Sequence, residues 1–113
     1  MFRRPGGPSA VVLMAEYGAF LWDASPEPHH PNAPWGPNAP GLLELGLSPG
    51  LVERLTTWHA VWEEMAYSNV GFASPEARRE WVERGSHLAS ELKDELPDTE
   101  VRYFHSAQSG RER

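Results

Sequence analysis

The sequence contains no cysteine, and this absence excludes several classes of protein at once. Disulfide staples, thiolate nucleophiles, zinc ribbons and cysteine-ligated iron–sulfur clusters all need a cysteine side chain. Long apolar runs are also missing, since the longest, Ala10 to Ala15, is far shorter than the roughly 20 residues that span a bilayer. No apolar signal segment follows the basic pair Arg3-Arg4. We therefore expect a soluble, cytoplasmic protein whose fold depends on packing alone.

Basic side chains are scarce. The chain has 10 Lys and Arg against 16 Asp and Glu, a net charge of −6. Four of the basic residues lie near the two ends, so residues 5–110 carry six basic and fifteen acidic side chains, a net charge of −9. Nucleic-acid binding needs clustered Lys and Arg to neutralise phosphates. We therefore expect no nucleic-acid partner, and we expect any protein partner to be basic.

The length and composition indicate one domain. The chain has 113 residues, of which 40% are hydrophobic, and this size suits a single compact core. Residues 1–9 are rich in proline and glycine and are expected to form a disordered leader. Residues 106–113 are expected to form a disordered tail, which leaves residues 10–105 as a single α+β domain.

Three segments have the character of strands. Ala10 to Ala15 is apolar without alternation and contains a β-branched pair, which is typical of a strand covered on both faces. Residues 19–22 resume the apolar pattern after Tyr17-Gly18, which indicates either a tight hairpin or one long bent strand, and we favour the hairpin. Residues 101–105 form a closing strand, which we expect to pair beside the first.

Two helices follow from capping residues and apolar spacing. Ser48 and Pro49 suit an N-cap and a first helical position, and Ser74-Pro75 repeats the pattern. Asn69 and Gly71 should end the first helix, and Pro97 the second. The first apolar stripe consists of Leu51, Leu55, Trp58, Trp62 and Met65, and the second of Trp81, Gly85, Leu88 and Leu92.

The order of these elements is ββααβ. It predicts an α+β fold in which a small two- or three-stranded sheet packs on a two-helix hairpin. Gly85 lies inside the apolar stripe of the second helix, where a glycine costs about 1 kcal/mol relative to alanine. We therefore expect another part of the chain to approach the backbone at Gly85, and a tryptophan of the first helix is the expected neighbour.

A proline-rich loop is expected at residues 24–41. It holds six prolines, which exclude a regular element and favour an extended, solvated segment that is dispensable for folding. It is either a surface insertion or a binding element in which Trp35 anchors a partner, although Trp35 could equally fold back on its own domain. The adjacent His29 and His30 point to opposite sides of an extended chain, so we expect no metal site there.

Signatures of catalysis are missing. No glycine-rich phosphate loop, nucleophile elbow or zinc-binding helix motif occurs. His59 and Glu63 form the best candidate pair, because residues four apart share a helix face and a carboxylate can raise the basicity of an imidazole. Such a pair is more often a surface hydrogen bond, and the sequence supplies no nucleophile or third ligand beside it. We therefore predict no enzyme activity, no cofactor and no metal site.

A cluster of acidic residues lies at the end of the second helix. It surrounds the single Lys93 and consists of Glu91, Asp94, Glu95, Asp98 and Glu100. Negative charge at a helix C-terminus opposes the helix dipole, so helix stability does not explain it. The cluster is either a solvated face or a patch that steers a basic partner. These five residues and Trp35 are the predicted partner-binding residues.

Several short motifs carry a resemblance to a known group. They are Leu21-Trp22, Leu45-Gly46-Leu47-Ser48, Trp58, Gly71-Phe72, Ser74-Pro75, Trp81, Gly85, Leu88, Glu95-Leu96 and residues 101–104. Over residues 11–105 the chain resembles a group of small uncharacterised proteins frequent in actinobacteria, some of them immunity-like and encoded near toxins. The repeat from Pro31 to Pro40 departs from that pattern. The resemblance supports the order of the elements and implies no catalytic residue.

These observations predict a non-catalytic protein-binding module of the immunity or antitoxin kind, with a basic protein as its partner. The alternative is a structural or accessory subunit that docks on a larger assembly through the Trp35 loop or a helix face. The sequence leaves the oligomeric state open.

Overall fold

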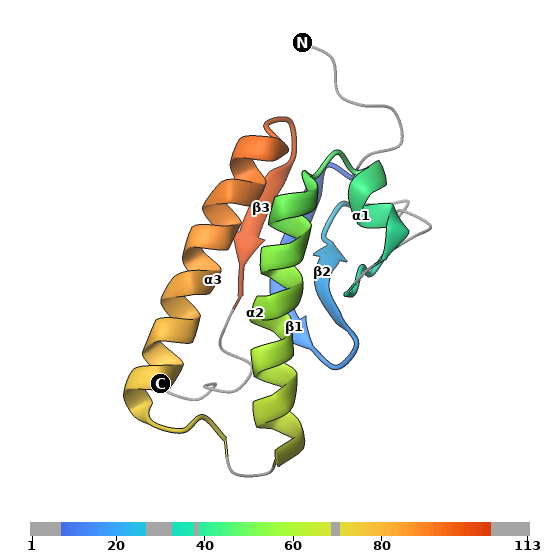
Figure 1. Ribbon diagram of the computed structural model, residues 1–113. Coiled ribbons are helices and arrows are strands. Elements are labelled where there is room, and N and C mark those ends of the chain that lie inside the picture. Colours follow the sequence, from blue (N-terminus) through green and yellow to red (C-terminus); the bar gives the residue numbers. More distant parts are fainter. Residues whose placement is uncertain (1–7, 27–32, 38, 69–70, 105–113) are drawn as a thin grey trace.

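The computed structural model describes residues 8–26, 33–37, 39–68 and 71–104. In chain order the elements are β1 (Ala10–Glu16), β2 (Ala19–Asp23), α1 (Pro40–Glu44), α2 (Pro49–Ser68), α3 (Pro75–Glu95) and β3 (Glu100–Tyr103). Figure 1 shows α2 and α3 side by side on one face of the sheet. The predicted α+β fold and the order ββααβ are confirmed, with α1 as one short additional helix. Most of the predicted leader and all of the predicted tail lie outside the described residues.

The three strands form a mixed sheet in the order β2-β1-β3. Strands β1 and β2 are antiparallel and joined by the predicted tight turn, where Gly18 has a φ of 80° that glycine adopts at little cost. Strand β3 runs parallel to β1, with Val101 opposite Val11. The closing strand therefore lies beside the first strand, as the sequence predicted.

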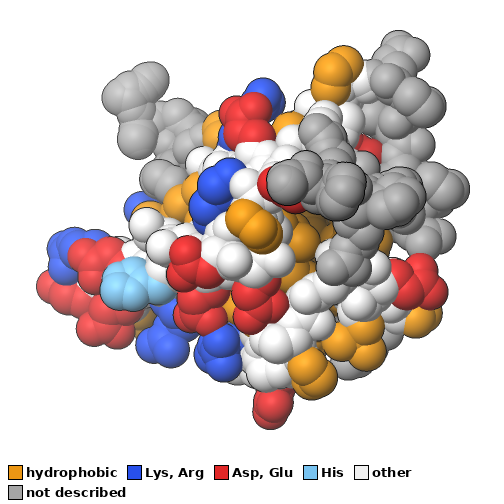
Figure 2. Space-filling model, turned by 90° about the horizontal axis from the view of Figure 1, so that it is seen from above, with side chains coloured by type: hydrophobic (Ala, Val, Ile, Leu, Met, Phe, Trp, Pro, Cys, Tyr) orange, Lys and Arg blue, Asp and Glu red, His pale blue; other side chains and the backbone are white. Residues whose placement is uncertain are grey.

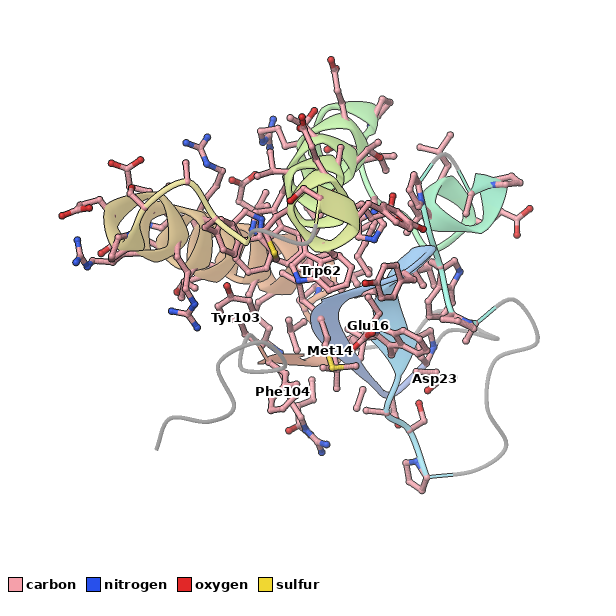
Figure 3. The ribbon with its side chains drawn as sticks, turned by 90° about the horizontal axis from the view of Figure 1, so that it is seen from below. Met14, Glu16, Asp23, Trp62, Tyr103 and Phe104 are labelled. Atoms are coloured by element: carbon pink, nitrogen blue, oxygen red, sulfur yellow. The ribbon has the colours of Figure 1, made fainter. Side chains whose placement is uncertain are left out.

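The sheet is fully covered on one face only. Val11, Leu13 and Ala15 of β1 are buried beneath the helices, whereas the residues between them are half-buried. Figure 3 shows Met14 and Phe104 on the side of the sheet away from the helices. The expectation that β1 is covered on both faces is therefore wrong, because the helices form a single layer. Within the described ranges, no helix combines the length and apolar character that a membrane span requires.

Both long helices begin and pack as the sequence predicted. The Ser48 hydroxyl accepts a hydrogen bond from the Leu51 amide at 3.3 Å, and that of Ser74 accepts one from Ala77 at 3.0 Å. The buried residues of α2 include four of the five predicted stripe residues, and Met65 is half-buried. All four predicted stripe residues of α3 are buried.

Two tryptophans join α2 to α3. The rings of Trp58 and Trp81 stack with centroids 4.5 Å apart and planes 4° from parallel. Each indole also donates a hydrogen bond to the other residue's carbonyl oxygen, from Trp58 at 3.0 Å and from Trp81 at 2.9 Å. Because both buried N–H groups are satisfied, the pair combines aromatic packing with polar complementarity.

The close approach predicted at Gly85 involves two aromatic side chains. A Cβ atom on Gly85 would lie 2.8 Å from Cζ2 of Trp58 and 2.2 Å from the hydroxyl oxygen of Tyr103. The predicted tryptophan is therefore present, and Tyr103 of β3 lies there as well. The Tyr103 hydroxyl donates a hydrogen bond to the Val82 carbonyl at 2.7 Å, and burial raises the pKa of this hydroxyl.

Of the two possibilities left open for Trp35, the structure shows the one in which it folds back on its own domain, and not the exposed anchor. Trp35 is fully buried, and its backbone pairs with the outer edge of β2. Its amide donates to the Leu21 carbonyl at 2.8 Å, and its carbonyl accepts from the Phe20 amide at 2.9 Å. An edge strand offers unpaired backbone groups, so the loop gains hydrogen bonds there while the indole enters the core. The loop is therefore part of the folded domain at Trp35, and Trp35 in this position is not available as a docking anchor.

The predicted exclusion of regular structure also fails at the end of the loop. Pro40 occupies the first turn of α1, where proline is tolerated because its missing N–H would have no helical partner. Residues 27–32 and 38, with His29 and His30 among them, lie outside the described residues.

Replacing Gly85 by leucine should destabilise the protein by about 1–3 kcal/mol, because the new side chain must displace Trp58 and Tyr103 from a packed core. Ser86→Leu is the matched control, since Ser86 is exposed on the same helix. Urea denaturation of the two variants measures the difference. Equal stability would mean that the helices and β3 do not meet at Gly85.

Candidate functional site

The candidate catalytic pair holds the β1–β2 turn against α2. His59 is fully buried, and its Nε2 lies 2.6 Å from the carbonyl oxygen of Glu16. Because a carbonyl only accepts hydrogen bonds, Nε2 carries the proton. Glu63 lies 3.7 Å from the same nitrogen and accepts a hydrogen bond from the Gly18 amide at 2.8 Å. The expectation of a surface hydrogen bond between the pair is therefore wrong, since both side chains bind the backbone of the turn.

Metal-binding residues do not gather in the described part of the chain. No group of three or more His, Asp or Glu side chains there could hold an ion. The candidate catalytic residues His59 and Glu63 instead bind backbone groups of the β1–β2 turn.

The five acidic residues predicted to bind a partner, Glu91, Asp94, Glu95, Asp98 and Glu100, are called the acidic end here. Two of them form ion pairs within the protein. Glu91 pairs with Arg54 of α2, and Glu100 accepts a hydrogen bond of 2.8 Å from Nε of Arg102. That hydrogen bond and the charge of Arg102 lower the pKa of Glu100.

A third acidic residue, Glu95, binds the start of α2. One carboxylate oxygen accepts from the Ser48 amide at 2.7 Å, and the other accepts from the Ser48 hydroxyl at 2.8 Å. A carboxylate at a helix N-terminus is stabilised by the unpaired amides and by the helix dipole. The dipole of α3 disfavours a negative charge at its C-terminal end. This contact explains why Glu95 is nevertheless found there, because its charge is stabilised by the N-terminus of α2. Lys93 donates to the carbonyls of Pro97 and Thr99 beyond the end of α3.

Asp94 and Asp98 are the remaining members of the acidic end. Both are exposed, and the described residues provide neither of them with a hydrogen bond or an ion pair. Figure 2 views the molecule from above, where the acidic and basic side chains are intermingled. Of the five acidic residues that the sequence suggested for partner binding, only Asp94 and Asp98 therefore have carboxylates without a bond to the described residues.

A groove of about 820 Å³ lies between α2 and α3. Its walls carry charges of both signs, including Glu53, Glu80, Glu83 and Arg84. The indoles of Trp58 and Trp81 beneath it are almost fully buried, and the ion pair of Arg54 with Glu91 joins the two walls. The groove therefore combines charges of both signs with apolar side chains, among them the exposed Val61.

Sequence reasoning missed an aromatic pair at the opposite end of α2. Tyr17 at the β1–β2 turn is 56% exposed and Tyr67 in the last turn of α2 is 68% exposed. Their ring centroids lie 5.1 Å apart, and Tyr17 makes a second edge-to-face contact with Trp62 at 5.1 Å. The sequence signal was an aromatic residue at a turn and another at a helix end, but their contact depends on the tertiary fold.

Comparison with protein families identifies the chain's relatives. A family model described as Serratia CdiI immunity protein-like matches residues 9–106. The chain belongs to this family. No curated protein matches the chain at a significant level. The immunity-like part of the resemblance seen in the sequence is thereby confirmed, and the match spans every helix and strand.

Replacing Glu95 by glutamine should destabilise the protein by about 1–2 kcal/mol, since the start of α2 loses a charged acceptor. Asp94→Asn removes the same charge from the neighbouring exposed position and should change the stability little. Chemical denaturation of both variants compares the two effects. If the Glu95 variant were as stable as the Asp94 variant, Glu95 would not cap α2.

Proposed function

We propose that this protein is a non-catalytic immunity protein that neutralises a toxin by binding to it. The observation that carries the proposal is the match of residues 9–106 to the immunity protein-like family, since it covers the whole folded domain. The site geometry is consistent with binding rather than catalysis. His59 and Glu63, the best candidates for acid–base chemistry, are engaged with the backbone of the β1–β2 turn.

The partner is proposed to be basic. Residues 5–110 carry a net charge of −9, and a field of one sign raises the rate at which an oppositely charged protein is encountered. Within the acidic end, Glu91, Glu95 and Glu100 contribute charge while bound to other groups of the same chain. Asp94 and Asp98 contribute charge and can also meet a partner directly.

The accessory-subunit alternative loses its main support in this structure. It named two docking elements, the Trp35 loop and a helix face, and of these Trp35 is buried against β2. No other observation favours it over the immunity function.

Co-expression with a candidate toxin, sought among the reading frames beside its gene, tests the proposal. Cells that produce the toxin should grow only when this protein is also produced, and the two proteins should purify as a complex. The Gly85→Leu variant, which is expected to be destabilised, serves as a control for dependence on the fold. Toxicity that persists in the presence of the folded wild-type protein would overturn the proposal.

Neutralising the two exposed acids with Asp94→Asn and Asp98→Asn should slow association with the toxin several-fold at about 10 mM salt, where charges act over about 30 Å. The effect should nearly vanish at about 1 M salt, where the screening length is about 3 Å. Ser86→Asn with Ser90→Asn is a charge-neutral control on exposed positions of α3. Stopped-flow or surface plasmon resonance measures the rates. An association rate insensitive to both salt and substitution would remove electrostatic steering from the proposal.

A further inference from the structure

Negative charge is distributed unevenly along the chain. Residues 5–77, which include β1, β2, α1 and α2, contain eight acidic residues and one basic residue, Arg54, a net charge of −7. The rest of the chain has a net charge of +1. Along the sequence, the acidic residues of α3 therefore alternate with basic residues, whereas those of the β1–β2 hairpin and α2 have almost no basic residue near them in the sequence.

The exposed tyrosine pair lies within this acidic part. We call Tyr17, Tyr67, Trp62, Glu63 and Glu64 the tyrosine end. The two tyrosine rings contact each other edge to face, and Tyr17 also contacts the buried Trp62. The Gly18 amide bound to Glu63 fixes the turn that carries Tyr17. Tyr67 is thus held by α2 and Tyr17 by the anchored turn before any partner arrives, which reduces the entropy lost on binding.

Two carboxylates flank Tyr67 on α2. Glu63 and Glu64 precede it by four and three residues, so both lie one helical turn before Tyr67 and next to it on the helix surface. Within residues 55–77 the sequence has no Lys or Arg to neutralise them. An aromatic face beside a carboxylate attracts a cation through the ring quadrupole and through charge. A guanidinium fits this arrangement better than an ammonium, because it is planar and can lie on a ring while its fork meets a carboxylate.

We propose that the tyrosine end is the contact surface for the toxin and that it takes an arginine side chain of the toxin against the ring of Tyr67. This inference rests on the proposed immunity function and specifies where the partner is held. Exposed tyrosines on rigid support are typical of the few residues that dominate binding energy at interfaces.

The tyrosine end and the acidic end have different roles in this arrangement. Figure 1 shows the β1–β2 turn and the end of α2 at the bottom of the molecule, and the end of α3 at the top. The 20 residues of α2 span about 30 Å, so one arginine cannot contact both ends. The acidic end acts on the approach of the toxin, and the tyrosine end determines how long the complex lasts.

Two substitutions test this proposal through the dissociation rate of the complex with the toxin. Tyr67→Ser should raise the rate about tenfold or more, and Glu64→Gln should raise it several-fold. Tyr67→Phe retains the ring face and should restore most of the lifetime. Leu43→Ser is the matched apolar control, since Leu43 is 53% exposed on α1. Glu53→Gln is the matched charge control, because Glu53 is exposed on the same side of α2 about three turns earlier.

Thermal denaturation of each variant ensures that a changed rate does not reflect unfolding. If the wild-type protein protects cells but Tyr67→Ser and Glu64→Gln dissociate at the rate of their controls, the toxin docks elsewhere, and only this proposal fails. If Tyr67→Phe behaves like Tyr67→Ser, the hydroxyl and not the ring face makes the contact, and the arginine stacking is overturned. A wild-type protein that neither binds nor protects overturns the immunity function together with this inference.

Discussion

The stacked pair of Trp58 and Trp81 is the contact on which the rest of the structure depends. It fixes the distance between α2 and α3, and its two indole hydrogen bonds fix their axial register. A side chain at position 85 would collide with Trp58, so the pair requires a glycine there. The same glycine makes room for Tyr103, which brings β3 beneath α3. One aromatic pair thereby positions both helices and the last strand.

The sequence predicted those parts of the fold that depend on local patterns. The helix starts at Ser48 and Ser74 and the turn at Gly18 each follow from residues within one turn of the feature itself. Trp35 shows where local patterns fail. Its flanking prolines indicate an extended and solvated segment, but at Trp35 the exposed edge of β2 supplies the hydrogen bonds that water was expected to supply. Composition alone cannot identify which extended segment meets a sheet edge.

The candidate sites show the same division. The acidic residues in residues 91–100 can be counted from the sequence, but the groups that they bind are known only from the fold. Glu95 meets Ser48 across 47 positions, so an apparent surplus of charge on α3 becomes a cap on α2. His59 and Glu63 share a helix face as predicted, yet what they bind is the turn at Gly18, 45 positions from Glu63. Spacing along one helix predicts which residues share a face and does not reveal what faces them.

The parallel pairing of β3 with β1 also affects how the protein is made. The first strand is synthesised before both long helices, whereas its neighbour at residues 100–103 is synthesised after them. Contacts between distant parts of a chain form slowly, because a long loop must close before they are gained. A nascent chain therefore cannot complete its sheet until residues 100–103 have been synthesised, after both of the helices that cover the sheet.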